Sequence, residues 1–273
     1  MEISEERKKQ MEIDDKKIAD NMRRITHRIV VFSGKGGVGK TTVSVNLAYS
    51  LYKTGEKTGI LDADVTGPNV PKMLGITNKP YISNTYMYPE IRSGVKIISL
   101  ATIVPHDQPV IWRGPMRSKL LNQFLGDVEW GELDYLIADL PPGTGDEILT
   151  MTQKMEPDLA IIVTTPQELS LIDSAKAVNM ARMMEIPKIA IIENMSGFFC
   201  PDCGHKINLY GNGGGEKQAK EMGVLFLGSL PINLETVLLA DKGKPIITEK
   251  PDADISMVMM EITGRIQNFF ESD

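Results

Sequence analysis

The chain has 273 residues, of which 42% are hydrophobic, and a formal net charge of −6 at pH 7. This length allows one large globular domain with its own core, and the acidic balance argues against a nucleic-acid partner. No apolar run approaches the roughly 20 residues that a membrane-spanning helix requires, and the charged N-terminus lacks the apolar core of a secretory signal. The chain has only two cysteines, which suits a reducing compartment. We therefore expect a cytoplasmic protein with no membrane and no nucleic-acid partner.

The N-terminal segment, residues 1–27, is rich in Lys, Glu, Asp and Arg, and its apolar residues give only a weak helical stripe. A segment of this composition buries little apolar surface and is typically solvated. We predict a charged, partly frayed helical arm outside the core over 1–27, and the globular domain over 28–273.

The next stretch has the pattern of a P-loop. An apolar, β-branched run at 29–32 precedes a glycine-rich loop, a lysine and two threonines, and an amphipathic helical pattern then begins. Glycines let backbone N–H groups converge on phosphate oxygens beside the helix N-terminus; the alternative is a turn that merely closes a β-to-α connection. Lys40 is expected to reach the β- and γ-phosphates and Thr41 to place its hydroxyl on Mg²⁺. The predicted nucleotide-binding residues of this loop are Gly34, Lys35, Gly36, Gly37, Val38, Gly39, Lys40, Thr41 and Thr42.

A second lysine stands early in this loop, at Lys35, within the sequence K-G-G-V-G-K-T-T. The stretch resembles the deviant P-loop of the ParA/MinD/nitrogenase-iron-protein superfamily, in which the early lysine reaches the nucleotide of the partner subunit. The resemblance implies ATP as the ligand, a catalytic role for Lys35 and Lys40, and a nucleotide-dependent homodimer. Spacing alone is also compatible with a solvated loop lysine at this position.

Two aspartates, Asp62 and Asp64, end the strand predicted at 57–64. Ligands of open α/β sheets bind at the carboxyl ends of the strands, so one carboxylate could orient an attacking water or lie in the outer shell of the metal. The alternative is an ordinary helix-capping carboxylate. The sequence D-A-D-x-x-G-P-x-x-P resembles the first switch region of Mrp/ApbC-type ATPases, which implies the hydrolytic role for Asp64.

The middle of the chain is predicted as an irregular hairpin over 76–94, a strand over 95–102 and a helix that begins near Pro115. The sequence W-R-G-P-M before this helix also resembles the Mrp/ApbC branch. This resemblance gives no chemical role to Arg113, and we keep Arg113 as a candidate interface residue.

An apolar strand over 133–140 ends at Asp139 and is followed by P-P-G-T-G-D. An apolar run that closes on an aspartate is typical of a Walker B motif, whose carboxylate holds Mg²⁺ through water or orders the adjacent loop. Gly143 would let the backbone approach the γ-phosphate and move when it leaves. The segment resembles the second switch of the same family, and we expect Asp139 to be catalytic.

Further βα units follow, with strands at 159–164, 188–193 and 224–230 and helices at 168–184 and 254–270. In the superfamily, an asparagine placed as Asn194 is here hydrogen-bonds the adenine edge, and the loop at Pro231 backs the base; without the resemblance, Asn194 could equally be a turn residue. The pattern predicts an α/β fold, a mostly parallel sheet flanked by helices on both faces, of the ParA/MinD/nitrogenase-iron-protein P-loop NTPase type.

The two cysteines, Cys200 and Cys203, form a C-x-x-C motif within G-F-F-C-P-D-C-G-H. Two thiolates do not complete a zinc site or a four-iron cluster, which usually require four ligands. Either His205 and an outside group complete a zinc site, or a second chain supplies another cysteine pair. A redox dithiol and two packed thiols are further alternatives.

From about residue 28 onward the chain resembles Mrp/ApbC proteins, which bind a [4Fe–4S] cluster between subunits and pass it to apo iron–sulfur proteins. The resemblance implies an ATP-dependent cluster carrier with slow, coupled ATP hydrolysis. One alternative is a MinD-like positioning ATPase, which would need a C-terminal amphipathic membrane helix with basic flanks. Another is a zinc-stabilised nucleotide-binding regulator.

Overall fold

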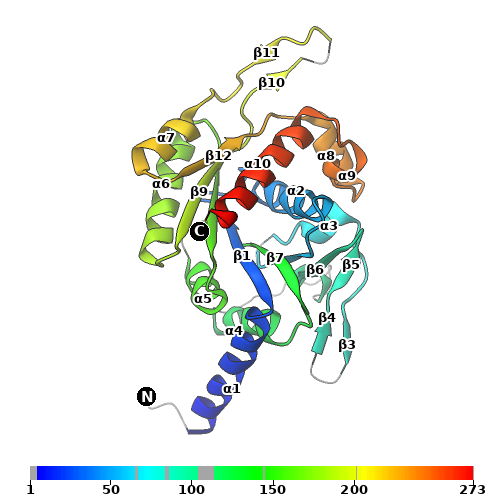
Figure 1. Cartoon of the computed structure of the whole chain (residues 1–273), viewed down its shortest axis with the longest axis vertical. Coiled ribbons are helices and arrows are strands. Elements are labelled where there is room, and N and C mark those ends of the chain that lie inside the picture. The colour runs from blue at the N-terminus through cyan, green and yellow to red at the C-terminus, as the bar shows by residue number, and fades with distance from the viewer. Residues whose placement is uncertain are drawn as a thin grey trace.

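The computed structural model describes residues 5–64, 67–83, 86–103, 114–143, 145–200 and 202–272. Within them, eight strands form one sheet in the order β12-β9-β8-β1-β7-β2-β6-β5, with helices on both faces (Figure 1). Seven strands run parallel and β5 pairs antiparallel to β6. The predicted fold class is confirmed. The strands are β1 Ile25–Phe32, β2 Thr58–Asp62, β5 Glu90–Arg92, β6 Val95–Ser99, β7 Leu133–Asp139, β8 Leu159–Thr164, β9 Lys188–Glu193 and β12 Leu225–Ser229.

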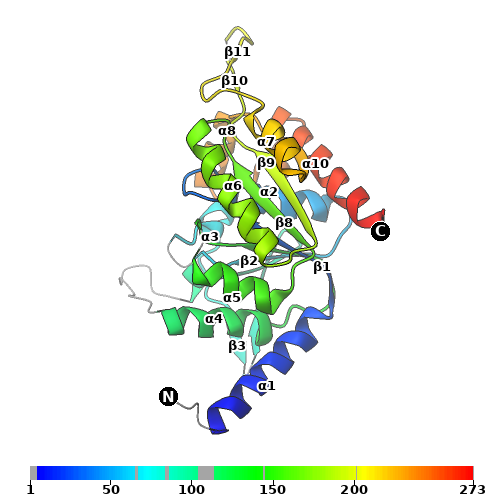
Figure 2. The same ribbon diagram turned by 90° about the vertical axis from the view of Figure 1, so that its left-hand side faces the viewer.

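The sheet is buried on both faces because its central strands are continuous apolar runs. Successive residues of a strand point to opposite faces, so Ile29 and Val31 of β1 join one core cluster, whereas Val30 and Phe32 join the other. The first cluster is covered by α2 (Lys40–Lys53), α9 (Ile246–Glu249) and α10 (Asp254–Glu271). The second is covered by α4 (Gly114–Gly126), α5 (Asp146–Met155), α6 (Glu168–Met183) and α7 (Gly214–Met222). Figure 2 shows α5 and α6 of the second layer in front of the sheet.

The N-terminal helix, α1 (Glu5–Met22), projects from the body with its first half and packs against α4 with its second half (Figure 2). Ile18 and Met22 are only 2% and 3% exposed; they lie four positions apart and therefore on the same helix face. Asn21 Nδ2 donates to the carbonyl oxygen of Leu125. The prediction of an arm outside the core is wrong for this half, and the first strand already begins at Ile25.

Other elements agree closely with the predicted pattern, with strands that end somewhat earlier than expected at Asp62 and Ser99. The excursion at 76–94 contains the hairpin of β3 (Tyr81–Ser83) and β4 (Tyr86–Tyr88) together with the edge strand β5. Trp112 and Arg113 lie outside the described residues, so the suggestion of an interface role for Arg113 stays untested. Three further elements are α3 (Val70–Leu74), α8 (Leu234–Asp241) and the 3₁₀ turn Leu100–Thr102.

One stability effect of pH follows from His27, whose ring stacks on Phe270 at a centroid distance of 4.1 Å. Burial lowers the pKa of His27, so the folded state favours the neutral ring. We expect the free energy of unfolding to fall as the pH drops below about 6.5, where the unfolded chain takes up the proton first. Urea unfolding at pH 7.5 and 5.5 measures this fall. A His27→Phe variant should show a smaller fall than the wild type; equal falls would contradict the assignment.

Candidate nucleotide-binding site and cysteine hairpin

The P-loop connects the carboxyl end of β1 to the first turn of α2 and forms one wall of a cavity of about 360 Å³. Gly37 and Gly39 have φ values of 80° and 81°, a left-handed conformation that favours glycine. The N-terminus of a 14-residue helix stands directly behind the loop. Backbone donors and the helix dipole therefore face the same space, which is suited to an anion.

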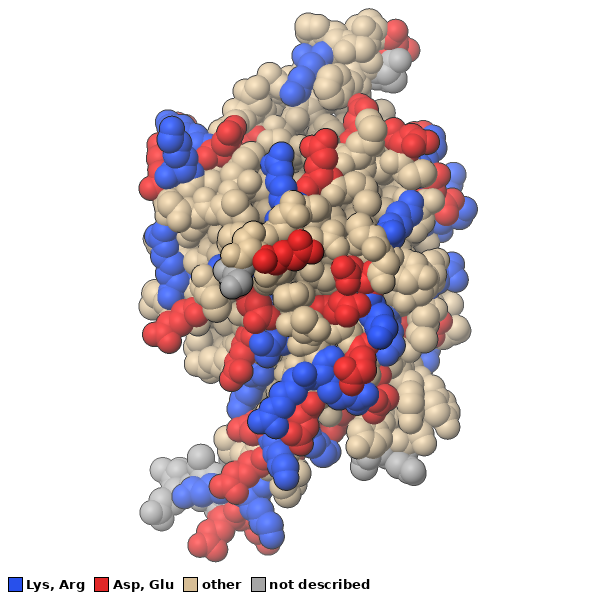
Figure 3. Space-filling view, in the orientation of Figure 1, with Lys and Arg blue, Asp and Glu red and all other residues tan. Residues whose placement is uncertain are grey.

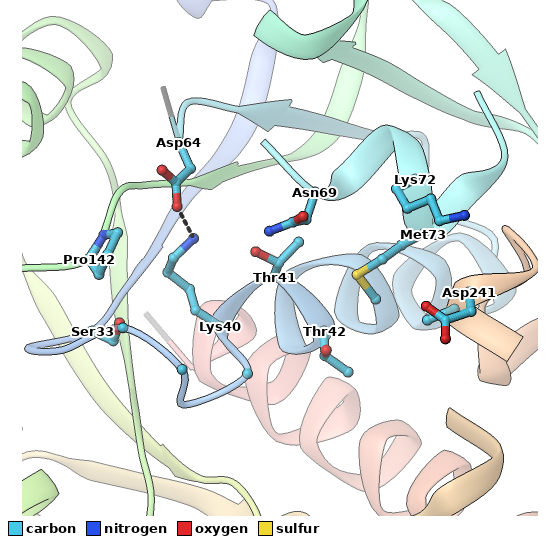
Figure 4. A pocket seen from close by; sticks show the side chains of 14 residues that line it. Ser33, Lys40, Thr41, Thr42, Asp64, Asn69, Lys72, Met73, Pro142 and Asp241 are labelled. Atoms are coloured by element: carbon cyan, nitrogen blue, oxygen red, sulfur yellow. Dashed lines mark ion pairs between the residues drawn. The ribbon is translucent and has the colours of Figure 1, made fainter. Parts of the chain in front are cut away.

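Seven of the residues predicted from the sequence line this cavity, and Figure 4 shows how most of them lie. The remaining lining residues come from the end of β1, from the loop before α3 and α3 itself, from the loop after β7 and from the end of α8. The predicted residues are Gly36, Gly37, Gly39, Lys40, Thr41, Thr42 and Asp64; the others are Ser33, Asn69, Lys72, Met73, Pro142, Ala240 and Asp241.

A buried charge network joins the P-loop to the end of β7. Lys40 Nζ lies 2.8 Å from Asp139 Oδ1, and Asp139 also accepts hydrogen bonds of 2.7 Å from the hydroxyls of Thr41 and Ser44. Asp139 is fully buried, and a buried carboxylate requires such partners. The ammonium and hydroxyl groups that could bind phosphate and a hard cation are thus held next to one another.

Asp64 faces Lys40 across the cavity (Figure 4), with 3.8 Å between Asp64 Oδ2 and Lys40 Nζ. Its other oxygen accepts a hydrogen bond from the backbone N–H of Gly67. A carboxylate in this position can accept a proton from, or orient, a water near the phosphate site.

Asp62 lies behind the cavity and is fully buried. The hydroxyl of Ser99 donates to it at 2.8 Å, and the backbone N–H of Val70 donates at 3.3 Å. Burial raises the pKa of the Asp62 carboxyl, and the nearby Asp139 carboxylate raises it further. Its contacts tie β2 to β6 and to the start of α3, so the structure gives it the role of a support rather than of a cavity-lining group.

Several predicted P-loop and switch residues do not line the cavity. Gly34 lies against α6, where a Cβ on Gly34 would meet the carbonyl oxygen of Asp173 at 2.1 Å. The carbonyl of Lys35 accepts a hydrogen bond from the Ser33 hydroxyl. The N–H of Gly143, where φ is 97°, donates to the carbonyl of Ser33 at 2.8 Å. The second switch is therefore attached to the end of β1.

Two predicted adenine-contact residues, Asn194 and Pro231, are also absent from the cavity wall. Asn194 is 7% exposed, and its Nδ2 donates to the carbonyl of Val38 at 2.8 Å. This side chain holds the P-loop from behind. The side chain of Val38 is buried. Pro231 lies in the loop that follows β12.

The cysteine motif lies on a short hairpin that projects from the body beyond α8 (Figure 1). Its strands are β10 (Phe198–Phe199) and β11 (Lys206–Ile207), which pair antiparallel. The N–H of Cys200 donates to the carbonyl of His205 at 3.0 Å, and that of Gly204 donates to the carbonyl of Cys200 at 2.9 Å. Cys203 is exposed and Cys200 half-buried, and neither forms a disulfide.

The two sulfurs have no third ligand within the described residues, among which no group of three or more His, Cys, Asp or Glu side chains is placed to hold a metal ion. The backbone N–H groups of Cys203 and Asp202, together with the Cys203 thiol, lower the pKa of Cys200. A lowered pKa favours the thiolate, which is the metal-ligand form of cysteine.

Comparison with known protein families identifies the family to which the chain belongs. The family model described as NUBPL iron-transfer P-loop NTPase, of ParA type, matches residues 24–267. The chain belongs to this family. An iron-sulfur cluster carrier protein of Methanocaldococcus jannaschii is 53% identical over 88% of this chain and 84% of its own length. The iron-sulfur cluster transfer protein NUBPL of Dictyostelium discoideum is 44% identical over 89% and 76%.

Solved structures agree with this membership in the NUBPL iron-transfer family. A nucleotide-binding protein from Archaeoglobus fulgidus, solved in complex with ADP, superposes with a TM-score of 0.76 at 38% identity over 88% of this chain and 94% of that one. The cell division ATPase MinD of Pyrococcus furiosus has a TM-score of 0.65 at 21% identity over 89% and 99%. The second likeness shows the shared fold alone.

Several site residues of this NUBPL-family chain are not predicted from its sequence. Ser44 stands one helical turn after Lys40, and this spacing was an available signal for its contact with Asp139. Asp241 comes from α8, far along the chain, and no local pattern connects it to the P-loop. Glu193 ends β9 next to Asn194, and its carboxylate accepts hydrogen bonds from Ser196 and Gly215.

Proposed function

We propose that this protein is an ATP-dependent iron–sulfur cluster carrier that works as a homodimer. The observation that carries the proposal is the cysteine pair on a projecting hairpin, attached to a P-loop domain and lacking a third ligand among the described residues. Ligand counting then requires an outside source of two donors, and a second copy of the same hairpin supplies them. The curated relatives named iron-sulfur cluster carrier protein support this reading.

The nucleotide roles follow from the charge network. Lys40 would leave Asp139 for the β- and γ-phosphates, and Asp64 would orient the attacking water. Lys35 would reach the nucleotide of the partner subunit, and Asn194 and Pro231 would lie beside the adenine. The hydroxyl of Thr41, 2.7 Å from the Asp139 carboxylate, suits an oxygen-binding cation, and Mg²⁺ when bound would neutralise phosphate charge. Hydrolysis is expected to be slow and coupled to cluster binding or transfer.

The cargo would be a [4Fe–4S] cluster held by Cys200 and Cys203 of each subunit. The hairpin surface suits a dimer contact, since Figure 3 shows its projecting end to be largely uncharged on the visible face. Large apolar side chains exposed there become buried when a second copy packs against them, which is favourable. They are Phe199, Ile207, Leu209 and Tyr210. Recipients would be apo iron–sulfur proteins.

The packing of the C-terminal helix argues against a MinD-like positioning function. Ile255, Met259, Ile262 and Ile266 of α10 are buried on the sheet, so this helix has no free apolar stripe for a membrane surface. Among the described helices, none has the length and apolar character needed to cross a bilayer.

Anaerobic reconstitution with ferrous iron and sulfide tests the proposal. The wild type should bind about four irons per dimer, develop visible thiolate-to-iron absorbance and shift to a dimer on size-exclusion chromatography. Cys203→Ala should lose the iron and the dimer shift, whereas Asp202→Ala in the same turn should keep both. About one zinc per dimer and no iron would instead identify the zinc-stabilised regulator and reject the carrier function.

A further inference from the structure

Glu193, the last residue of β9, is a fully buried carboxylate that lies outside the nucleotide cavity. Its Oε1 accepts hydrogen bonds from the Ser196 hydroxyl at 2.6 Å and from the backbone N–H of Gly213 at 3.0 Å. Its Oε2 accepts from the N–H of Gly215 at 2.6 Å. Removing a carboxylate from water costs free energy, and several hydrogen-bond donors around it offset this cost.

These three donors belong to both legs of the cysteine hairpin, and a fourth, the Ser229 hydroxyl at the end of β12, donates to Oε1 at 3.3 Å. Ser196 lies on the leg that leads out to Cys200, whereas Gly213 and Gly215 follow the returning leg at the start of α7. The N–H groups at a helix start have no partner within the helix, so the carboxylate of Glu193 supplies one. A single side chain therefore fastens the two ends of the hairpin to the sheet.

The residue that follows Glu193 contacts the P-loop, and Met195 lies close to it. The amide of Asn194 donates to the carbonyl of Val38. A Cβ on Gly39 would lie 2.2 Å from Asn194 Nδ2 and 3.7 Å from Met195 Cε. The chain thus passes within four residues from a P-loop contact to the base of the cysteine hairpin.

The backbone at this junction is held in an unusual conformation. Met195 has φ of 59°, a left-handed value that is uncommon for a non-glycine residue and persists only where surrounding contacts enforce it. Gly197 on the same leg has φ of 86°, and Gly211 and Gly213 on the returning leg have values of 88° and 72°. Both legs therefore turn sharply where they meet the Glu193 carboxylate.

We propose that Glu193 is the positioning residue that couples nucleotide occupancy of the P-loop to the orientation of the cysteine hairpin. This proposal rests on the proposed function for its biological meaning, but its mechanics concern only the nucleotide and the hairpin. A nucleotide that orders the P-loop also orders Asn194 and Met195, and the carboxylate transfers that order to both legs. The cysteines then take one fixed orientation for cluster binding or release.

Glutamine at this position tests the hydrogen bonds without changing the packing, because it has nearly the same size as glutamate but only one acceptor oxygen. Its NH₂ group would face a backbone N–H, and two donors cannot form a hydrogen bond with each other. Glu193→Gln should therefore loosen at least one leg while leaving β9 and the P-loop in place. Ser256→Ala is a matched control, since Ser256 is a similarly buried polar residue in α10, which covers the face of the sheet opposite to α7.

Hydrogen exchange of the cluster-free full chain, with and without Mg²⁺ and a non-hydrolysable ATP analogue, tests the coupling. In the wild type and Ser256→Ala, nucleotide should slow exchange at least about 3-fold in the P-loop and in 195–200 and 205–213. In Glu193→Gln, exchange in the P-loop should still slow with nucleotide. In the hairpin, the ratio of the exchange rates without and with nucleotide should fall to about 1. Ser196→Ala, which keeps the carboxylate and removes one donor, should give an intermediate ratio.

A hairpin that ignores nucleotide in the wild type would overturn the proposal, as would an undiminished hairpin response in Glu193→Gln. Loss of the P-loop response together with the hairpin response in that variant would also overturn it, because Glu193 would then act on the whole nucleotide site. A wild type that shows the predicted exchange pattern but binds no cluster would reject the carrier function and support the coupling. The two proposals therefore fail separately.

Discussion

Replacing Lys40 with methionine will reduce ATP hydrolysis by about 100-fold or more, the range found when one strong donor to developing charge is removed. Lys40 lies on the cavity wall between the carboxylates of Asp64 and Asp139. Methionine keeps much of the apolar stem but cannot bind phosphate. Steady-state phosphate release measures the loss, and Lys79→Met, an exposed lysine outside the cavity, should retain wild-type activity.

The same substitution will also destabilise the nucleotide-free protein. It removes the ion pair of 2.8 Å and leaves the fully buried Asp139 carboxylate with its hydroxyl donors alone. Breaking a buried pair from one side costs about 3 kcal/mol or more. A second substitution, Asp139→Asn, removes the uncompensated charge, so the double variant should recover much of the stability but none of the activity. Lys40→Met activity within 10-fold of wild type would contradict the assigned role.

The local parts of this site are predictable from the sequence because the physics that forms them is local. The P-loop needs a strand, a run of glycines and a helix start in direct succession, and all three are readable between residues 29 and 49. Asp139 is predictable for the same reason, since a buried strand delivers its last residue to the edge where ligands collect.

The supporting contacts are not readable, because each joins segments that are distant in sequence. Asp62 takes its partner Ser99 from the neighbouring strand, 37 positions away. Asn194 contacts Val38 across 156 positions, so its expected adenine contact gives way in this structure to a hold on the P-loop. The weak apolar stripe of α1 does not by itself predict burial, because α4 is the element that covers Ile18 and Met22. Sequence indicates which residues carry chemistry, but packing decides which of them face the ligand.

Gly34 illustrates that distinction, because Gly34→Ala will be severely destabilising. The new Cβ would lie 2.1 Å from the carbonyl oxygen and 2.3 Å from the carbonyl carbon of Asp173. These are backbone atoms in the middle of α6, so they cannot turn away as a side chain could. We expect the free energy of unfolding to fall by about 3 kcal/mol or more, and nucleotide affinity to fall as the loop shifts away from α6.

Gly36→Ala provides the matched control in the same loop. A Cβ there would meet nothing closer than the Cγ of Pro142 at 4.0 Å, which is ordinary contact. Its unfolding midpoint in urea should equal or slightly exceed that of the wild type, because alanine restricts the unfolded chain. Gly34→Ala should show a lower midpoint with an unchanged slope. Equal midpoints for the two variants would mean that Gly34 serves the phosphate site, as its motif suggests, and not the close packing of the P-loop on α6.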